Sequence, residues 1–158
     1  IARVLDQELN ELNAQGVCLH HLGDLAGVEQ DLQNKVRKAI ELTKNNDRLI
    51  LNVAFNYGGR AEILHAVRQM LADQIAPETL TESLFSSYLF TRGLPDPDLV
   101  IRTSGELRIS NFLIWQAAYS EFYPTPVYWP DFGREELYEA IVAFNQRERR
   151  FGLVTETS

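Results

Sequence analysis

Short apolar stretches alternate with longer amphipathic stretches along this chain, and this alternation is what most constrains its fold. The clearest apolar stretch is Leu49 to Phe55 (LILNVAF), which is typical of a strand covered on both faces. Apolar residues recur at helical spacing before it, in 1–15 and 31–45, and after it, in 60–74. This order favours an α/β fold, with a mostly parallel β-sheet flanked by helices and joined by right-handed crossovers.

The other predicted elements continue the alternation. Further strands are predicted at 17–22, 98–103 and 124–129, and further helices at 81–90, 111–120 and 134–150. Gly16 is expected to end the first helix as its C-cap. On the helix 60–74, the residues spaced for burial are Ile63, Leu64, Val67 and Leu71. Because ligands of such sheets lie beyond the carboxyl ends of strands, the candidate loops are 56–60 and 103–111.

Size and charge exclude several classes of protein. The 158 residues fit one α/β domain, and no repeat or linker divides them. The net charge of -7 predicts no nucleic-acid partner, so any anion site must be a local basic pocket. Cys18 is the only cysteine, which favours a small buried side chain in a reducing compartment such as the cytoplasm. No run of about 18 apolar residues is present to span a bilayer.

The stretch 102–111 (RTSGELRISN) carries the most informative chemistry. Arg102 and Arg108 offer planar guanidinium forks that fit phosphate oxygens. Ser110 is expected to cap the helix 111–120, whose free backbone N–H groups would add a positive dipole end. Together these features describe a phosphate-binding pocket. The alternative is structural: the two arginines would pair with acids and hold the loop, the candidates being Asp98, Glu106 and Asp131.

Glu121 is a candidate ligand for Mg²⁺. It follows the predicted helix 111–120, where the helix dipole disfavours a carboxylate, so a compensating cation is expected. Mg²⁺ is usually held by one or two carboxylates together with substrate phosphates. The alternative is an exposed acid on a loop.

Two other features give weaker signals. The turn 56–60 (NYGGR) allows a ligand to approach the backbone closely, but it lacks the lysine and spacing of a phosphate-binding P-loop, so a tight strand-to-helix turn is an equal alternative. His20, His21 and His65 show no metal-binding spacing. The predicted last helix ends with Arg147, Arg149 and Arg150, which are expected to complement its dipole.

Three stretches of the sequence resemble one known family. They are LNVAFNYGGRAEI, PDLVIRTSGELRISNFLIWQAAYSEFYPTPVYWPDF and AFNQRERRFG. They closely resemble the cis-prenyltransferases, of which the undecaprenyl diphosphate synthases are the best-known members. The match runs from about the first helix to Gly152, and the motifs are long and ordered.

The resemblance implies an activity and a set of site residues. Such enzymes condense isopentenyl diphosphate onto an allylic prenyl diphosphate with cis double-bond formation, giving polyprenyl diphosphates such as undecaprenyl diphosphate. They use Mg²⁺ and form homodimers. At the matching positions, the diphosphate of isopentenyl diphosphate would be held by Arg102, Arg108 and Ser110 with the backbone of Ile109. Glu121 would bind Mg²⁺, and the strand 49–55 would border the tunnel for the growing chain.

The sequence departs from the family pattern in two places. Leu107 stands where many bacterial members have histidine. The family's Asp-Gly-Asn motif is absent from residues 1–158, so the chain is expected to be the C-terminal part of a longer enzyme, with the catalytic aspartate upstream of residue 1. One alternative is a catalytically silent subunit of a heteromeric cis-prenyltransferase, although a silent scaffold would not need the arginines and serine. An unrelated phosphate-binding α/β domain is the other alternative.

Two expectations concern partners. The stretch 122–129 is apolar enough to serve as the dimer interface. Because the substrate is amphiphilic and the product is a lipid, peripheral contact with a membrane surface is also expected.

Overall fold

The computed structural model describes the backbone of residues 2–147 and the side chains of residues 7–147. The chain divides into two compact units, Ile1–Gly93 and Leu94–Ser158, each described here by itself. The prediction of a single domain remains a prediction. In the described part, no helix is long and apolar enough to cross a membrane.

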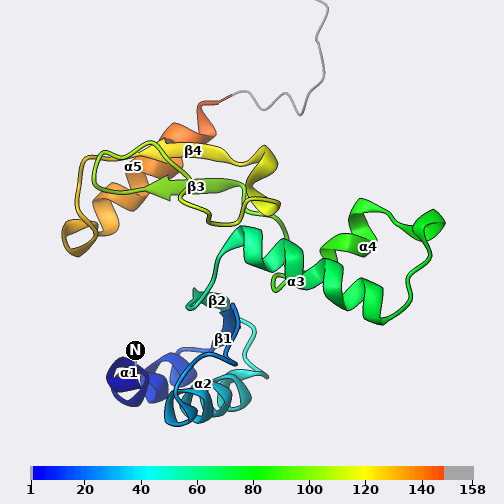
Figure 1. Ribbon diagram of the computed structural model, residues 1–158. Helices are drawn as coiled ribbons and strands as arrows, with labels where there is room; N and C mark the ends of the chain where they lie inside the picture. Colours follow the sequence, from blue (N-terminus) through cyan, green and yellow to red (C-terminus); the bar gives the residue numbers. More distant parts are fainter. Residues whose placement is uncertain (1, 148–158) are drawn as a thin grey trace, which may run out of the picture. The chain divides into compact units, whose positions relative to one another are not determined.

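The first unit is built on a pair of parallel strands with two helices beside it (Figure 1). Its elements are α1 (Ala2–Ala14), β1 (Val17–Leu22), α2 (Gln30–Thr43), β2 (Leu49–Ala54), α3 (Gly59–Ala72), a 3-10 helix (Pro77–Thr79) and α4 (Glu82–Ser86). β1 pairs with β2 in the register Val17 to Leu49 through Leu22 to Ala54. The prediction for β1 is confirmed residue for residue, and Gly16 follows α1 with a φ of 76°.

The core of this unit lies where α1 and α2 pack on β1. Val17, Leu19 and Ala39 are buried together, and Leu9 and Leu12 pack against them. Thr43, which is fully buried at the end of α2, links the two layers, since its Oγ1 accepts from the Leu19 N–H at 3.0 Å and donates to the Ala39 carbonyl at 2.9 Å. Cys18 is buried and free, as predicted.

The prediction that β2 is covered on both faces is wrong for this structure. All six of its residues are exposed, from Leu51 at 38% to Leu49 at 56% among the large apolar ones. The reason is that β1 pairs with only one edge of β2, while α1 and α2 pack on β1.

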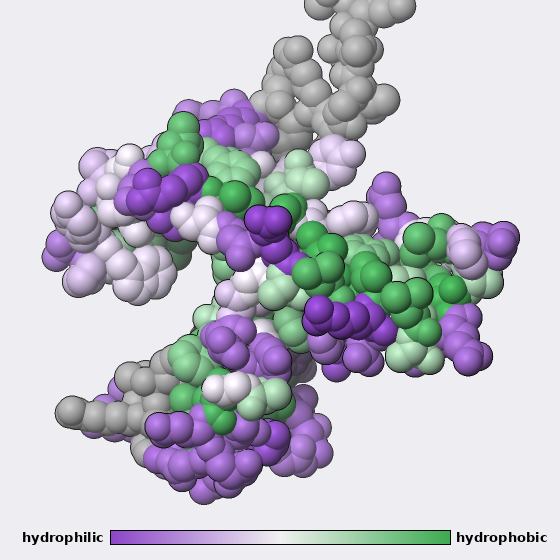
Figure 2. Space-filling model, in the orientation of Figure 1, coloured by the Kyte–Doolittle hydropathy of each residue, from purple (hydrophilic) through white to green (hydrophobic). Residues whose placement is uncertain are grey.

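The buried face of α3 also differs from the prediction. Glu62, Ala66 and Met70 are buried, whereas Leu64, Val67 and Leu71 are exposed. Figure 2 shows hydrophobic side chains gathered on the visible surface over α3 and the segment that follows it. The predicted apolar stripe therefore lies about one residue away from the side that packs.

The second unit holds a second pair of parallel strands and a helix. β3 (Leu99–Arg102) pairs with β4 (Glu121–Pro124), from Leu99 to Glu121 through Arg102 to Pro124. α5 (Arg134–Asn145) packs on β4. Residues 148–150 of the predicted last helix lie outside the described residues. The parallel strands and their helices in the two units confirm the predicted α/β fold.

Two predicted elements between β3 and α5 are wrong. Residues 111–120 form no α-helix, only a 3-10 helix at Gln116–Tyr119, because Asn111 and Leu113 have φ of 62° and 46° and interrupt helical geometry. The last strand is β4 at 121–124 and not 124–129. Pro124 and Pro126 lack a backbone donor, which favours the end of regular pairing there.

Candidate functional site

The loop that follows β3 starts directly after Arg102, the last residue of that strand, and is tied to the chain after β4. The Thr125 N–H donates to the Arg102 carbonyl at 2.8 Å, and the Gly105 N–H donates back to the Thr125 carbonyl at 2.8 Å. The Ser104 N–H adds a bond to the Val127 carbonyl at 2.9 Å. These bonds extend the β3–β4 ladder and fix the start of the loop, where Ser104 and Gly105 both have a φ of 67°.

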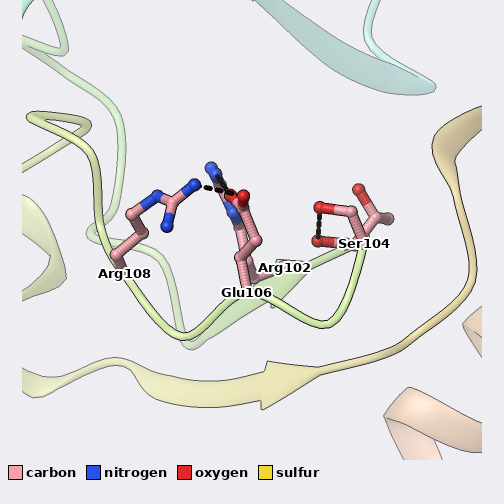
Figure 3. A network of polar contacts seen from close by, with 5 residues as sticks. Arg102, Ser104, Glu106 and Arg108 are labelled. Atoms are coloured by element: carbon pink, nitrogen blue, oxygen red, sulfur yellow. Dashed lines mark hydrogen bonds and ion pairs between the residues drawn. The ribbon is translucent and has the colours of Figure 1, made fainter.

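Arg102 and Arg108 converge on one carboxylate, that of Glu106 (Figure 3). The Arg102 Nη2 donates to Glu106 Oε2 at 2.5 Å, and the Arg108 Nη2 donates to Glu106 Oε1. The Nε of Arg102 is buried and has no hydrogen-bond partner. The structure thus brings the two predicted arginines together, and it also contains the acid pairing of the structural alternative, with Glu106 as the acid.

The arginines set the charge of Glu106. The hydrogen bond from Arg102 lowers the pKa of Glu106 below its usual value of 4.5, and the charge of Arg108 acts in the same direction against partial desolvation. Glu106 therefore carries its negative charge at neutral pH, and the cluster of three side chains has a net charge of +1.

Ile109 and Ser110 are the next two residues of the loop after Arg108. The Ile109 carbonyl accepts from the Phe112 N–H at 3.0 Å, closing a turn, and Ser110 is exposed with a φ of 49°. The prediction that Ser110 caps a helix is wrong, because no α-helix begins there. The dipole of such a helix is therefore no part of this site.

Glu121 lies at the first position of β4 and is paired with a cation. The Arg147 Nη1, just beyond α5, donates to Glu121 Oε2 at 2.7 Å. The sequence predicts a compensating positive charge for Glu121, and in this structure an arginine supplies it. Nowhere in residues 7–147 do three or more His, Cys, Asp or Glu side chains gather in a way that could hold a metal ion.

The predicted site residues therefore fall into two places on the second unit. Arg102 ends β3, whereas Glu121 begins the neighbouring strand and pairs with Leu99. Three steps of about 3.3 Å along a parallel ladder put the backbones of these two positions about 10 Å apart. The arginines, Ile109 and Ser110 share one loop, and Glu121 lies at the other end of the ladder.

Sequence reasoning did not single out Glu62, which organises the turn 56–60 in the first unit. Its side chain is 1% exposed; Oε2 accepts from the Tyr57 hydroxyl at 2.5 Å and Oε1 from the Phe90 N–H at 2.8 Å. A glutamate in the first turn of a helix that follows a Gly-Gly pair could have signalled this role. These contacts favour the interpretation of residues 56–60 as a tight strand-to-helix turn over that of a ligand-binding turn.

Comparison with known proteins identifies the family of the chain. The family model described as "Putative undecaprenyl diphosphate synthase" matches residues 1–152. An isoprenyl transferase of Heliobacterium mobile is 47% identical over 156 residues, which are 96% of this chain and 60% of that protein. A ditrans,polycis-undecaprenyl-diphosphate synthase of Legionella pneumophila is 46% identical over 157 residues, which are 97% of this chain and 66% of that protein.

Solved structures agree with these relatives. A lavandulyl diphosphate synthase from Lavandula x intermedia, in complex with dimethylallyl diphosphate, has a TM-score of 0.91 and 34% identity over 96% of this chain and 68% of its own. A probable undecaprenyl diphosphate synthase from Campylobacter jejuni has a TM-score of 0.86 and 34% identity over 96% of this chain and 70% of its own. The chain spans 60% of the first of the curated relatives above and 66% of the second. With a family match over nearly its whole length, the chain belongs to the cis-prenyltransferases, the family of the undecaprenyl diphosphate synthases.

Proposed function

We propose that this chain supplies the isopentenyl diphosphate site of a cis-prenyltransferase. The reaction condenses isopentenyl diphosphate with an allylic prenyl diphosphate, forms a cis double bond and gives a polyprenyl diphosphate such as undecaprenyl diphosphate. The names of the relatives support the reaction type. In this proposal, groups outside residues 1–158 complete the site for the allylic substrate.

The convergence of Arg102 and Arg108 on a single carboxylate is the observation that carries the proposal. Two guanidinium groups that both reach one acid lie close enough to bind one diphosphate group. The Arg102 Nε–H is buried and has no acceptor in this structure, which is unusual for a buried polar group. The chain as a whole has a net charge of -7. An anionic substrate therefore depends on a local group of positive charges, and the arginine cluster is such a group.

Ile109 and Ser110 would complete the diphosphate site. The Ser110 side chain is exposed and the residue lies two positions after Arg108, so its hydroxyl can donate to a phosphate oxygen bound by that arginine. The backbone N–H of Ile109 would donate beside it. By holding the diphosphate at several points, these residues orient the homoallylic double bond towards the allylic carbon.

Glu121 fits a Mg²⁺ site only in part. It provides one carboxylate, and one oxygen of that carboxylate already accepts from Arg147. Since Mg²⁺ keeps several waters and takes substrate phosphate oxygens, one protein carboxylate is compatible with a shared site. Glu121 would hold the ion through Oε1, and the ion would supply charge stabilisation for the departing diphosphate.

We also propose a homodimer and contact with a membrane surface. Tyr128 and Trp129 are 66% and 72% exposed, and the Trp129 ring stacks on Phe132 with ring centroids 5.8 Å apart. Exposed aromatic residues are enriched at protein interfaces, which supports an association surface there. Sedimentation of the full-length protein tests the dimer, and Trp129→Ala should weaken it. Flotation with lipid vesicles tests the membrane contact.

The substrate site is tested by kinetics of Arg102→Ala and Arg108→Ala in the full-length protein. Each variant should raise the KM for isopentenyl diphosphate by roughly 10- to 100-fold, because a hydrogen bond to a charged group is worth about 1.5–3 kcal/mol. Arg134→Ala, which removes an exposed arginine at the start of α5, is the matched control and should change little. Wild-type kinetics in both cluster variants would refute the site. Isopentenyl diphosphate binding without any turnover would favour the silent subunit.

A further inference from the structure

Glu106 lies inside the proposed diphosphate site, although a carboxylate is not expected to contact an anionic substrate. It uses a different oxygen for each arginine: Oε2 accepts from Arg102 and Oε1 from Arg108. Figure 3 shows the Arg108 guanidinium group pointing towards Glu106, which overlaps Arg102 in this view. Glu106 therefore either competes with the substrate for the arginines or holds the arginines in place for it.

The arginines would not converge without a bridging anion. Two like charges repel each other, and the Arg108 side chain is 62% exposed on a loop, with many rotamers open to it. Glu106 is only 31% exposed, and its backbone lies between those of the two arginines. Its carboxylate offsets the repulsion between the two guanidinium groups, since it accepts from both.

The contacts of Glu106 leave donors for a ligand. Each arginine reaches it through Nη2 alone, so the Nη1 of each guanidinium group makes no bond to Glu106. Arg–carboxylate pairs are frequently bidentate and would then occupy two donors of one fork, whereas Glu106 occupies one donor of each arginine. The geometry therefore matches a support for the arginines better than a competitor for them.

We propose that Glu106 is a positioning residue of the diphosphate site, which holds Arg102 and Arg108 convergent so that the diphosphate binds a preformed pair. This inference rests on the proposed function. The positioning role and simple electrostatics predict opposite effects of Glu106 substitution on anion affinity. Removing a negative charge beside an anion site should strengthen anion binding, whereas removing a positioning residue should weaken it, because the ligand must then order two arginines by itself.

The test measures binding of inorganic pyrophosphate to the full-length protein by calorimetry. Glu106→Gln should weaken binding about 5- to 10-fold, as expected for the ordering of one or two long side chains. Glu106→Asp, which keeps the charge on a shorter stem, should recover part of the loss. Glu135→Gln removes the same charge from an exposed position at the start of α5 and should leave binding within about twofold. Unchanged or tighter binding by Glu106→Gln would overturn the inference.

Two further measurements separate the possible failures. If Arg102→Ala abolishes pyrophosphate binding while Glu106→Gln does not weaken it, the site stands and the positioning role is wrong; if Arg102→Ala has no effect, the site and the role both fall. Nuclear magnetic resonance relaxation of the Arg108 Nε–H without ligand gives an independent readout. Its order parameter should fall in Glu106→Gln, and an unchanged value in a variant with wild-type circular dichroism would contradict the proposal.

Discussion

At the scale of single residues, the pKa of Glu106 reports directly on the arginine cluster. The hydrogen bond from Arg102 is the largest cause that holds this pKa below 4.5. A carboxyl group whose folded pKa is lowered contributes stability above its unfolded value, and loses that contribution as the pH falls through the folded pKa. Acid should therefore loosen the cluster only below pH 4.5.

We expect the side-chain carboxyl carbon of Glu106 to titrate with a midpoint below 4.5 in the wild-type protein. In Arg102→Ala the midpoint should rise, because the largest cause of the lowered pKa is then absent. Carbon-detected magnetic resonance across an acid-to-neutral pH series measures both midpoints. Arg134→Ala should leave the Glu106 midpoint where it is. The same midpoint in wild type and Arg102→Ala would contradict the contact.

Glu62 gives a second residue-scale prediction, on stability. Glu62→Ala removes a carboxylate that is 1% exposed and that accepts from the Tyr57 hydroxyl and the Phe90 N–H. Leaving a buried donor without a partner costs about 1–3 kcal/mol, and the free energy of unfolding should fall by an amount in this range because both donors are part-buried. Urea denaturation measures it. Glu78→Ala, at an exposed position, should have a much smaller effect, and equal losses would argue against this role of Glu62.

Residue types in the sequence predict part of the candidate site. Arg102 and Arg108 are identifiable because guanidinium chemistry suits phosphate, and the structure brings them together. The sequence offers three acids as their partners, and only the three-dimensional structure selects Glu106. The sequence places Ser110 wrongly at a helix start, because its left-handed backbone conformation cannot be read from residue type alone.

At the scale of elements, the carboxyl ends of β1 and β2 depend on Gly23. Its φ is 130°, and a Cβ there would lie 2.3 Å from the Phe55 carbonyl oxygen, where the two strand ends are joined by the Asp24 N–H bond to the Asn56 carbonyl at 3.2 Å. Gly23→Ala should therefore strain its own backbone and also push the two strand ends apart.

Gly93 supplies the matched control, because its φ is also positive but a Cβ added there would meet no atom within 4 Å beyond its chain neighbours. Backbone strain alone costs about 1–3 kcal/mol, which is the loss in unfolding free energy expected for Gly93→Ala. Gly23→Ala should lose more unfolding free energy than Gly93→Ala, since the clash with the Phe55 carbonyl oxygen adds to the backbone strain. Chemical denaturation of both variants measures the difference. Equal losses would show that the strand ends adapt without cost.

Elements are predictable where periodicity is strong and turn residues mark the boundaries. β1 and α2 of the first unit lie within about two residues of their predicted bounds. Residues 103–129 are poorly predicted. Their apolar side chains suggest a helix at 111–120 and a strand at 124–129, and the backbone forms neither. The left-handed conformations at Asn111 and Leu113 leave no periodic signal in the sequence.

At the scale of the whole molecule, a net charge of -7 coexists with a site proposed for an anion. The described charges show how: the acid at the arginine cluster is shared by two cations, and Glu121 has its own cation in Arg147. If Mg²⁺ and a diphosphate bind as one complex, this bound complex must connect Glu121 with the arginines across the β3–β4 ladder. Composition predicts that any anion site must be a local cluster of basic side chains. It carries no information about the distance between that cluster and Glu121.

A double-mutant cycle on Glu121 and Arg102 decides whether the two ends of the ladder act together. Substitutions about 10 Å apart with no shared partner add to within about 0.5 kcal/mol, whereas residues that bind one ligand couple by about 0.5–3 kcal/mol. We expect coupling between Glu121→Gln and Arg102→Ala in the affinity of the full-length protein for pyrophosphate with Mg²⁺, and none with pyrophosphate in a chelator. Arg147→Ala in the same cycle controls for loss of the ion pair, because it leaves the Glu121 carboxylate in place. Additive effects under both conditions would mean that Glu121 serves only its pairing with Arg147, and that the metal, if required, is held elsewhere.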